Sequence, residues 1–132
     1  MIKKILVTLL FISIMQSLIA QSADTGIIGE YANELPLSTS IILRDEIKEV
    51  TEKYTEREKK AIYINFGAKY PKNTFALIIN EENFSKFSKI FELINKDVEV
   101  EGSIESYLFH NPDGSYSKAK CIILTNQNQL HF

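Results

Sequence analysis

The chain has 132 residues, of which 45% are apolar and 24% charged, and its formal net charge is −2. This length fits one domain, and the balance is that of a chain that folds rather than of a disordered one. The charge excludes the strongly basic surface of a protein that coats DNA. A single cysteine excludes an internal disulfide framework, and two histidines leave little material for a metal centre, so we expect no metal and no cofactor.

The first twenty residues have the pattern of a secretory signal peptide. Lys3 and Lys4 form a positive start, residues 5–15 are almost entirely apolar, and Ala20 is a small residue at the expected cleavage site before Gln21. The apolar run is shorter than the about 20 residues of a typical membrane span. We therefore predict a signal peptide at 1–20 and a periplasmic or secreted protein without integral membrane association, with a retained N-terminal anchor as the alternative.

The next forty residues are less regular. Residues 21–40 contain glycines, a proline and small polar residues without helical or strand periodicity, which indicates a flexible leader before a folded domain at 41–132. The apolar residues of this leader that can pack against the domain are Ile27, Ile28, Leu35 and Leu37. Residues 41–60 are ambiguous. The apolar residues of 41–54 suit an irregular strand, whereas the helix formers of 44–60 favour a helix by local propensity.

In the rest of the domain, one segment has the apolar spacing of a helix and the segments around it have the features of strands. Apolar residues with helical spacing over 84–95 predict one short helix. Gly102 suggests a bulge or bend inside a strand. With 41–54 as the first strand, the chain becomes a mainly β, five-stranded OB-fold-like barrel with the helix between strands 3 and 4. Alternating apolar residues predict strands over 61–66 and 98–109. The β-branched and aromatic residues of 74–79 and the apolar run within 115–124 predict two more.

The only cysteine lies in the last expected strand. Cys121 is followed by Ile122, Ile123 and Leu124. A cysteine among such neighbours usually behaves as a small buried apolar residue. We therefore expect a buried thiol, with pairing to another chain as the alternative.

Signatures of enzymes are absent from the sequence. It contains no nucleophile elbow, no zinc-protease motif and no phosphate-binding glycine loop. Neither His110 nor His131 can be matched to a nucleophile and an orienting acid. Glu99, Glu101 and Glu105 alternate along a strand and could chelate calcium, but a solvated strand face is the favoured interpretation. We therefore expect a protein that is not an enzyme.

One set of residues combines lysines with aromatic rings at the expected inter-strand loops. The loop between the first two strands and the loop between the last two border the same face of an OB barrel. Rings there can stack on bases while lysines contact phosphates. Glu52, Glu56 and Glu58 interleave the first basic cluster, and rim tyrosines are often half-buried, so a rim without ligand is the alternative. The candidate ligand-binding residues are Lys59, Lys60, Tyr63, Tyr70, Tyr116 and Lys118.

Two segments resemble small exported bacterial OB-fold domains. Residues 63–67, Tyr-Ile-Asn-Phe-Gly, followed by Lys-Tyr-Pro-Lys-Asn-Thr-Phe at 69–75, are similar to a hairpin of these domains. The alternating valines and glycine of 98–104 resemble their fourth strand. The resemblance implies an OB barrel and favours a strand over 41–54. It also implies single-stranded nucleic acid, or a fragment that contains nucleotides, as the ligand.

The chain departs from this family at the rim where such folds bind ligands. Asp45 and Glu46 stand where family members usually have a glycine, and the last loop is extended around 111–114. The resemblance therefore supports the fold more strongly than the ligand. An exported protein-interaction or envelope-structural domain, with another exported protein as its partner, remains the alternative function.

Overall fold

The computed structural model describes residues 26–55 and 58–132. The expected signal peptide at 1–20, the start of the leader and Glu56 of the first loop lie outside the described residues. Within the described part of the chain, no helix is long and apolar enough to cross a membrane.

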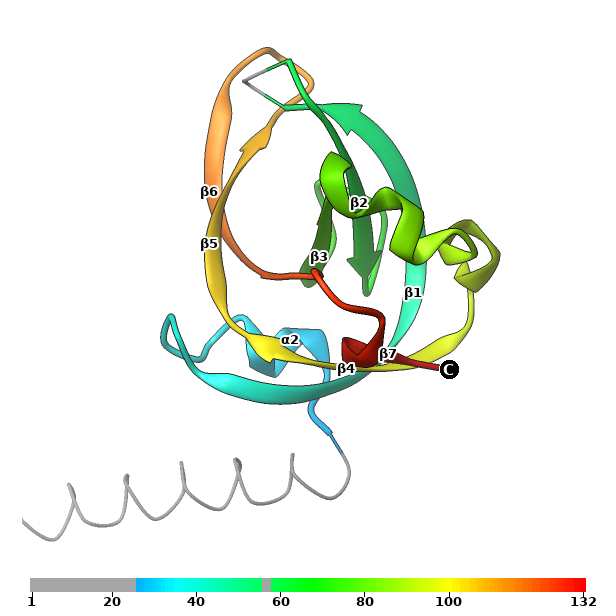
Figure 1. The fold of residues 1–132 in the computed structure, drawn as a ribbon. Helices are drawn as coiled ribbons and strands as arrows, with labels where there is room; N and C mark the ends of the chain where they lie inside the picture. The colour runs from blue at the N-terminus through cyan, green and yellow to red at the C-terminus, as the bar shows by residue number, and fades with distance from the viewer. Residues whose placement is uncertain (1–25, 56–57) are drawn as a thin grey trace, which may run out of the picture.

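The structure is mainly β, with seven strands in one open sheet that curls around a core (Figure 1). The strand order is β5-β6-β3-β2-β1-β4-β7. All neighbouring strands are antiparallel except β3 and β6, which are parallel. The strands are β1 (Ser40–Tyr54), β2 (Lys60–Phe66), β3 (Phe75–Asn80), β4 (Asp97–Ser103), β5 (Glu105–His110), β6 (Tyr116–Ile123) and β7 (Leu130–His131).

The ambiguous first segment is the long strand β1, so the prediction of a strand over 41–54 is confirmed. The N-terminal half of β1 pairs with β4 and its C-terminal half pairs with β2. The pairing register shifts between Ile47 and Glu49, which lets one strand bend and serve both sides of the barrel. These two sets of ladder hydrogen bonds override the local preference of the segment for helix.

The expected five strands are seven in the structure, for two reasons. The predicted fourth strand is interrupted at the buried Ile104, which separates β4 from β5. Gly102 lies just before this break, where a Cβ atom would stand 2.5 Å from Cγ2 of Ile122, so only a glycine allows β4 to approach β6 this closely. The short strand β7 then adds to the free edge of β4. The remaining order of elements is that predicted for an OB-like barrel.

The segment between β3 and β4 contains two short 3₁₀ helices rather than the one helix predicted over 84–95. They are η1 (Glu81–Phe87) and η2 (Ile90–Leu93). The buried residues Phe87, Ile90 and Leu93 recur every third position, which suits the three residues per turn of a 3₁₀ helix. Neither helix has a side-chain N-cap. The predicted position is therefore right, and the predicted type is wrong.

The described part of the leader packs against the barrel through Ile27 and Leu35, two of the four apolar residues expected to do so, whereas Ile28 and Leu37 are exposed. It contains the short helix α2 (Gly29–Ala32), and Ile27 forms an isolated parallel bridge with Leu43 of β1. The backbone N–H of Gly29 donates to Oδ2 of Asp45 at 2.8 Å. The carboxylate of Asp45 thus holds the leader against β1. The leader residues Ile27, Ala32 and Leu35 belong to the main core.

Alternate residues of β2 belong to two different clusters. Ile62, Ile64 and Phe66 lie in the main core inside the curled sheet. Ala61 and Tyr63 belong to a second, smaller cluster on the other face of the strand. Both faces of β2 are therefore covered by other parts of the protein. We call the smaller group the aromatic cluster; its buried members are Ala61, Tyr63, Ala76, Ile78, Phe109 and Cys121, with Tyr70, Tyr107 and Ile123 packed against them.

The expected burial of the cysteine is confirmed, because Cys121 lies fully buried in the aromatic cluster. Burial, followed by the charge of Glu105, raises the pKa of the Cys121 thiol to about 12. Since the thiolate is the reactive form, we expect iodoacetamide at pH 8 to leave the native protein unmodified and to alkylate it in denaturant. Mass spectrometry measures both reactions. Rapid alkylation of the native protein would show that the aromatic cluster does not bury Cys121.

Candidate ligand-binding surface

The antiparallel strands β5 and β6 form a hairpin with two chemically different faces. Because directly paired residues of such strands point to the same side, the register assigns each side chain to a face. One face bears the rings of Tyr107 and Phe109 and turns toward the barrel. We call the other the outer hairpin face; it comprises the pairs Ser106 with Lys120, Leu108 with Lys118, and His110 with Tyr116.

The aromatic side of the hairpin covers Tyr63 of β2. The ring centroid of Tyr63 lies 5.5 Å from that of Phe109 and 6.2 Å from that of Tyr107. Tyr63 is only 2% exposed as a result. The stacking role predicted for Tyr63 does not fit this burial, because a base cannot reach a ring that the hairpin already covers. Its aromatic contacts give Tyr63 a structural role.

Tyr70, in the turn between β2 and β3, contacts residues near the tip of the hairpin. Its ring stacks on Phe109 at 6.1 Å, and its hydroxyl donates a hydrogen bond to Oδ1 of Asn111. Nζ of Lys53 stands 5.1 Å from the centroid of the same ring. Burial, followed by the negative charge of Asp113, raises the pKa of Tyr70 above its ordinary value. Both the ring and the hydroxyl of Tyr70 therefore make contacts within the protein, and the residue is half-buried.

Lys59 and Lys60 lie beside β5, as the predicted site requires. Both line a cavity of about 320 Å³ between the end of the β1–β2 loop, the start of η1 and β5. Leu108 lines this cavity and also belongs to the outer hairpin face, where it pairs directly with Lys118. Because Leu108 belongs to both, the cavity and the outer hairpin face meet along β5.

Negative charge is concentrated on one side of this surface. Nζ of Lys60 lies 3.7 Å from Oε1 of Glu52, and Glu81 and Glu82 line the cavity. These carboxylates offset the two lysines of the cavity. The outer hairpin face contains no Asp or Glu among its six residues. The positive charge of the outer hairpin face comes from Lys118 and Lys120, and Nζ of Lys120 also donates to the carbonyl oxygen of Leu35 at 2.6 Å. Asp113, in the turn of the hairpin, is the carboxylate that lies beside His110 at the edge of this face.

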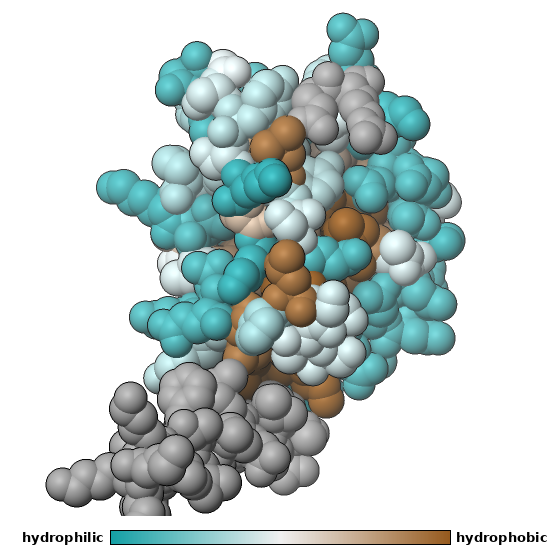
Figure 2. Space-filling model, turned by 90° about the vertical axis from the view of Figure 1, so that its left-hand side faces the viewer, coloured by the Kyte–Doolittle hydropathy of each residue, from teal (hydrophilic) through white to brown (hydrophobic). Residues whose placement is uncertain are grey.

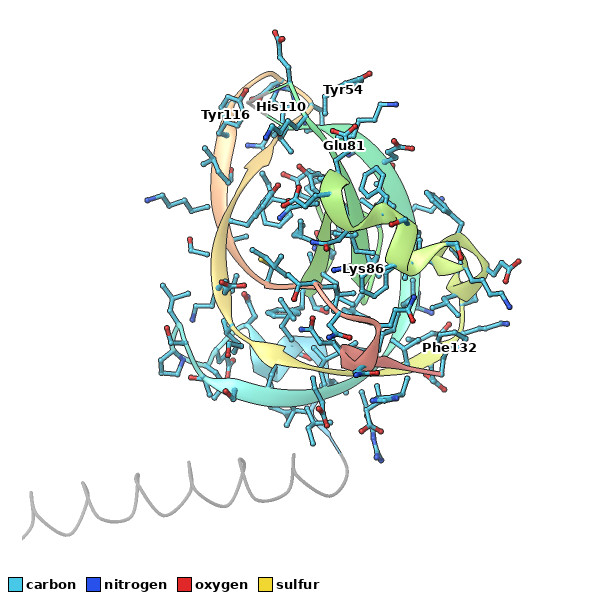
Figure 3. All side chains as sticks on the ribbon, viewed as in Figure 1. Tyr54, Glu81, Lys86, His110, Tyr116 and Phe132 are labelled. Atoms are coloured by element: carbon cyan, nitrogen blue, oxygen red, sulfur yellow. The ribbon has the colours of Figure 1, made fainter. Side chains whose placement is uncertain are left out.

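Two tyrosine rings at this end of the barrel are open to solvent. Tyr116 is 46% exposed and contacts the edge of His110, with ring centroids 5.0 Å apart. Tyr54, at the end of β1, is 64% exposed. Figure 3 shows Tyr54, His110 and Tyr116 at the same end of the molecule, near the β1–β2 and β5–β6 turns. Exposed rings beside lysines can stack on flat ligands without first leaving a core.

The exposed side of the hairpin is not a continuous apolar patch. Figure 2 views the molecule from the side of β5 and β6 and shows separate apolar areas among hydrophilic ones. Within the described residues, no group of three or more histidine, cysteine, aspartate or glutamate side chains could hold a metal ion. The described surface therefore presents cations and single exposed rings.

The structure divides the six predicted residues into two groups. Lys59, Lys60, Tyr116 and Lys118 share the surface formed by the cavity and the outer hairpin face. Tyr63 and Tyr70 belong to the aromatic cluster beneath the hairpin. The prediction omitted Leu108, which joins the two parts of the surface. The period of two through Leu108, His110, Tyr116 and Lys118 is the sequence signal that places these residues on one hairpin face.

Comparisons with known proteins add little to this geometry. No protein-family description matches the chain, and no curated protein matches its sequence. Among solved structures, a Plasmodium falciparum SSB in complex with ssDNA is similar at 17% identity and a TM-score of 0.43, covering 75% of this chain and 95% of that one. The mitochondrial single-stranded DNA binding protein Rim1 of S. cerevisiae is similar at 19% identity and a TM-score of 0.39, covering 67% and 97%. At these values neither a family nor a function follows from the likeness.

Proposed function

We propose that this protein is a non-catalytic module that binds single-stranded nucleic acid, or a fragment containing nucleotides, across the outer hairpin face. One observation carries the proposal. The exposed Tyr116 and Lys118 occupy a face without carboxylates, and Leu108 connects this face to the cavity that holds Lys59 and Lys60. Lysines along a surface with an exposed ring are the elements that bind single strands without base-specific hydrogen bonds.

Each element has a distinct role in the proposed complex. The ring of Tyr116 stacks on a base, while Lys118 contacts a phosphate on the same face. Lys59 and Lys60 contact the backbone where the strand passes the cavity. Stacking is tolerant of base identity, so we expect weak dependence on sequence. A duplex keeps its bases stacked inside, and we therefore expect preference for single strands over duplex of the same sequence.

We also propose that residues 1–20 direct export and are removed. The positive start, the apolar run and the small residue before Gln21 support this proposal. Mass spectrometry of the protein recovered from outside the cytoplasm would then give a chain that begins at Gln21. A protein retained in the cytoplasm with its first residues intact would contradict export, without bearing on nucleic-acid binding.

Charge reversal on the hairpin tests the binding surface. We expect Lys118→Glu to weaken binding of a labelled mixed-sequence single strand about tenfold, because it removes a charged contact to phosphate and adds a repulsive charge. Fluorescence anisotropy measures the affinity. Lys96→Glu is the matched control, since Lys96 is also an exposed lysine but precedes β4 and lies outside the proposed surface.

The control separates a specific surface from a general effect of net charge. Equal weakening by Lys118→Glu and Lys96→Glu would overturn the proposed surface. Absence of binding by the unaltered protein would overturn the nucleic-acid function itself. The alternative, a domain that interacts with another exported protein, would then be tested by sedimentation and by isolation of that partner.

A further inference from the structure

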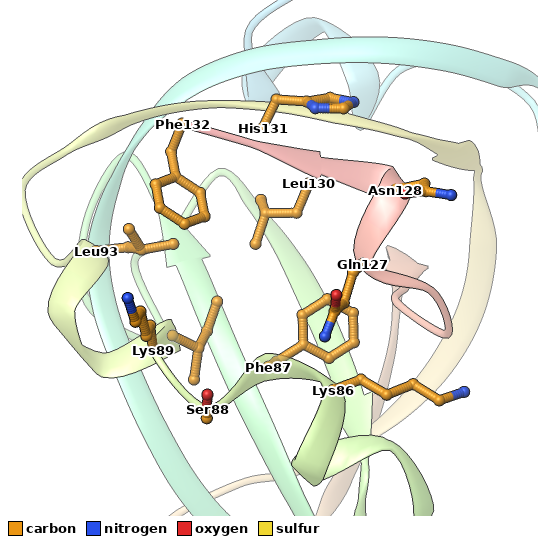
Figure 4. Close-up of a pocket in the computed structure, with 11 residues that line it drawn as sticks. Lys86, Phe87, Ser88, Lys89, Leu93, Gln127, Asn128, Leu130, His131 and Phe132 are labelled. Carbon is orange, nitrogen blue, oxygen red and sulfur yellow. The ribbon is translucent and has the colours of Figure 1, made fainter.

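A second cavity lies between the two 3₁₀ helices and the C-terminal segment, and it shares no lining residue with the surface proposed above. Its volume is about 390 Å³. We call it the C-terminal groove (Figure 4). This volume lies at the lower end of the range of small-molecule sites, about 300–1,000 Å³. Its lining residues come from η1, η2, the segment that joins them, and residues 127–132.

The base of the C-terminal groove is apolar and rigidly placed. Phe87, Ile90, Leu93 and Leu130 line it, and each is at most 8% exposed because its remaining surface packs in the main core. The ring of Phe132 stands over this base and is 75% exposed. Figure 4 shows Phe132 and Leu130 projecting from the C-terminal segment, with Phe87 and Leu93 below them. A ligand with an apolar part would remove the exposed ring from water.

The charged side chains at the rim are of one sign. Lys86 and Lys89 line the C-terminal groove, and among the described residues no aspartate or glutamate side chain lines it, although the whole chain carries a net charge of −2. Figure 4 places the two lysines on either side of the apolar base and His131 on the far side of its strand. The two ammonium groups therefore favour an anionic group at the edge of the groove.

One rim lysine is held in place by the fold. Nζ of Lys86 donates to the carbonyl oxygen of Thr125 at 3.0 Å. A lysine ammonium has three N–H donors, so Lys86 can keep this contact and still donate to an anionic group. Ser88 and Gln127 add polar side chains to the lining. The groove thus combines an apolar base with cationic donors at its edge.

We propose that the C-terminal groove binds a small amphipathic carboxylate, a molecule with one carboxylate head and a short apolar chain or ring. The apolar part lies on Leu93, Leu130 and Phe132. The carboxylate meets the ammonium groups of Lys86 and Lys89. The volume of the groove limits the ligand to a small molecule, and the ammonium groups of Lys86 and Lys89 favour a negative head group. This site is independent of nucleic-acid binding.

Octanoate is the probe for this proposal, and NMR of the isotope-labelled full chain is the measurement. We expect saturable shifts of the amide signals of Leu93, Leu130 and Phe132. Acetate supplies the head without the chain, and octyltrimethylammonium supplies the chain with the opposite charge. Neither should produce these shifts at the same concentration, because the site needs both an apolar part and a negative charge.

Two substitutions locate the ligand. Lys89→Glu is expected to weaken octanoate binding about fivefold, since it reverses one rim charge. Lys72→Glu is the matched control in the β2–β3 turn and should leave the affinity unchanged. Phe132→Ala should also weaken binding without unfolding the protein, because Phe132 is largely exposed. Equal binding of octyltrimethylammonium, unchanged affinity in Lys89→Glu, or no shifts with octanoate would each overturn the proposal.

Discussion

Replacing Leu43 by alanine is expected to lower the free energy of unfolding by about 3.5 kcal/mol, the middle of the range for fully buried leucines. Leu43 is completely buried in the main core. On one side of β1, Leu43 pairs with Val100 of β4. On the other side, it forms an isolated bridge with Ile27 of the leader. Truncation therefore leaves a cavity where three segments meet.

Urea unfolding followed by circular dichroism measures this loss. Leu37→Ala is the matched control, since Leu37 belongs to the same leader region but is 52% exposed. A substitution at such a surface position usually changes stability by about 0.5 kcal/mol or less. Similar losses in the two variants would contradict the packing of the leader and β1 described above.

Replacing Tyr116 by alanine is expected to weaken single-strand binding by about 5- to 150-fold. Loss of one base–aromatic stack costs about 1–3 kcal/mol, and each 1.4 kcal/mol is a factor of ten in affinity. Tyr116 is 46% exposed, and its described ring contact is with the exposed His110, so its removal should leave the barrel folded. The affinity loss therefore reports on ligand contact.

Tyr31→Ala provides the comparison for this result. Tyr31 is 51% exposed, similar to Tyr116, but it lies on α2 and outside the proposed surface. We expect its removal to leave the affinity unchanged. If Tyr116→Ala binds as tightly as the unaltered protein, or if Tyr31→Ala weakens binding equally, stacking on the hairpin is excluded. Circular dichroism of both variants would confirm that the barrel is intact.

Local patterns in the sequence predicted the strands of this fold with useful accuracy. The expected strands at 61–66 and 74–79 correspond to β2 and β3 within one residue at each end. Their period of two survives folding because each strand keeps distinct residues on its two faces. The first strand was harder, because its helix-forming residues compete with pairing partners that are distant in the chain.

The sequence did not show that the segment between β3 and β4 forms 3₁₀ helices rather than an α-helix. The predicted apolar stripe over 84–95 consists of Phe84, Phe87, Phe91, Leu93 and Ile94, with Ile90 beside them. The structure buries Phe87, Ile90 and Leu93 and leaves Phe91 and Ile94 exposed. Which apolar residues face the core depends on the span between β3 and β4, and periodicity alone does not contain that information.

The candidate site was predicted in part for a similar reason. Alternation shows that Tyr63 points away from Ile62 and Ile64, but it does not say what covers that face. Folding of the β5–β6 hairpin across β2 brings Phe109 onto Tyr63, a contact between residues 46 positions apart in the sequence. Lys118 and Tyr116, at the exposed side of that hairpin, needed only strand periodicity to be placed together.

The measurement that tests the central proposal most directly is the titration of a labelled single strand at about 50 and about 200 mM salt. Three lysine contacts to phosphate, those of Lys59, Lys60 and Lys118, predict a slope near −2 in log affinity against log salt and about a twentyfold loss over this range. Fluorescence anisotropy gives both affinities. Binding that weakens by about this factor supports the proposed surface. Absence of binding at low salt, or an affinity that does not change with salt, would contradict it.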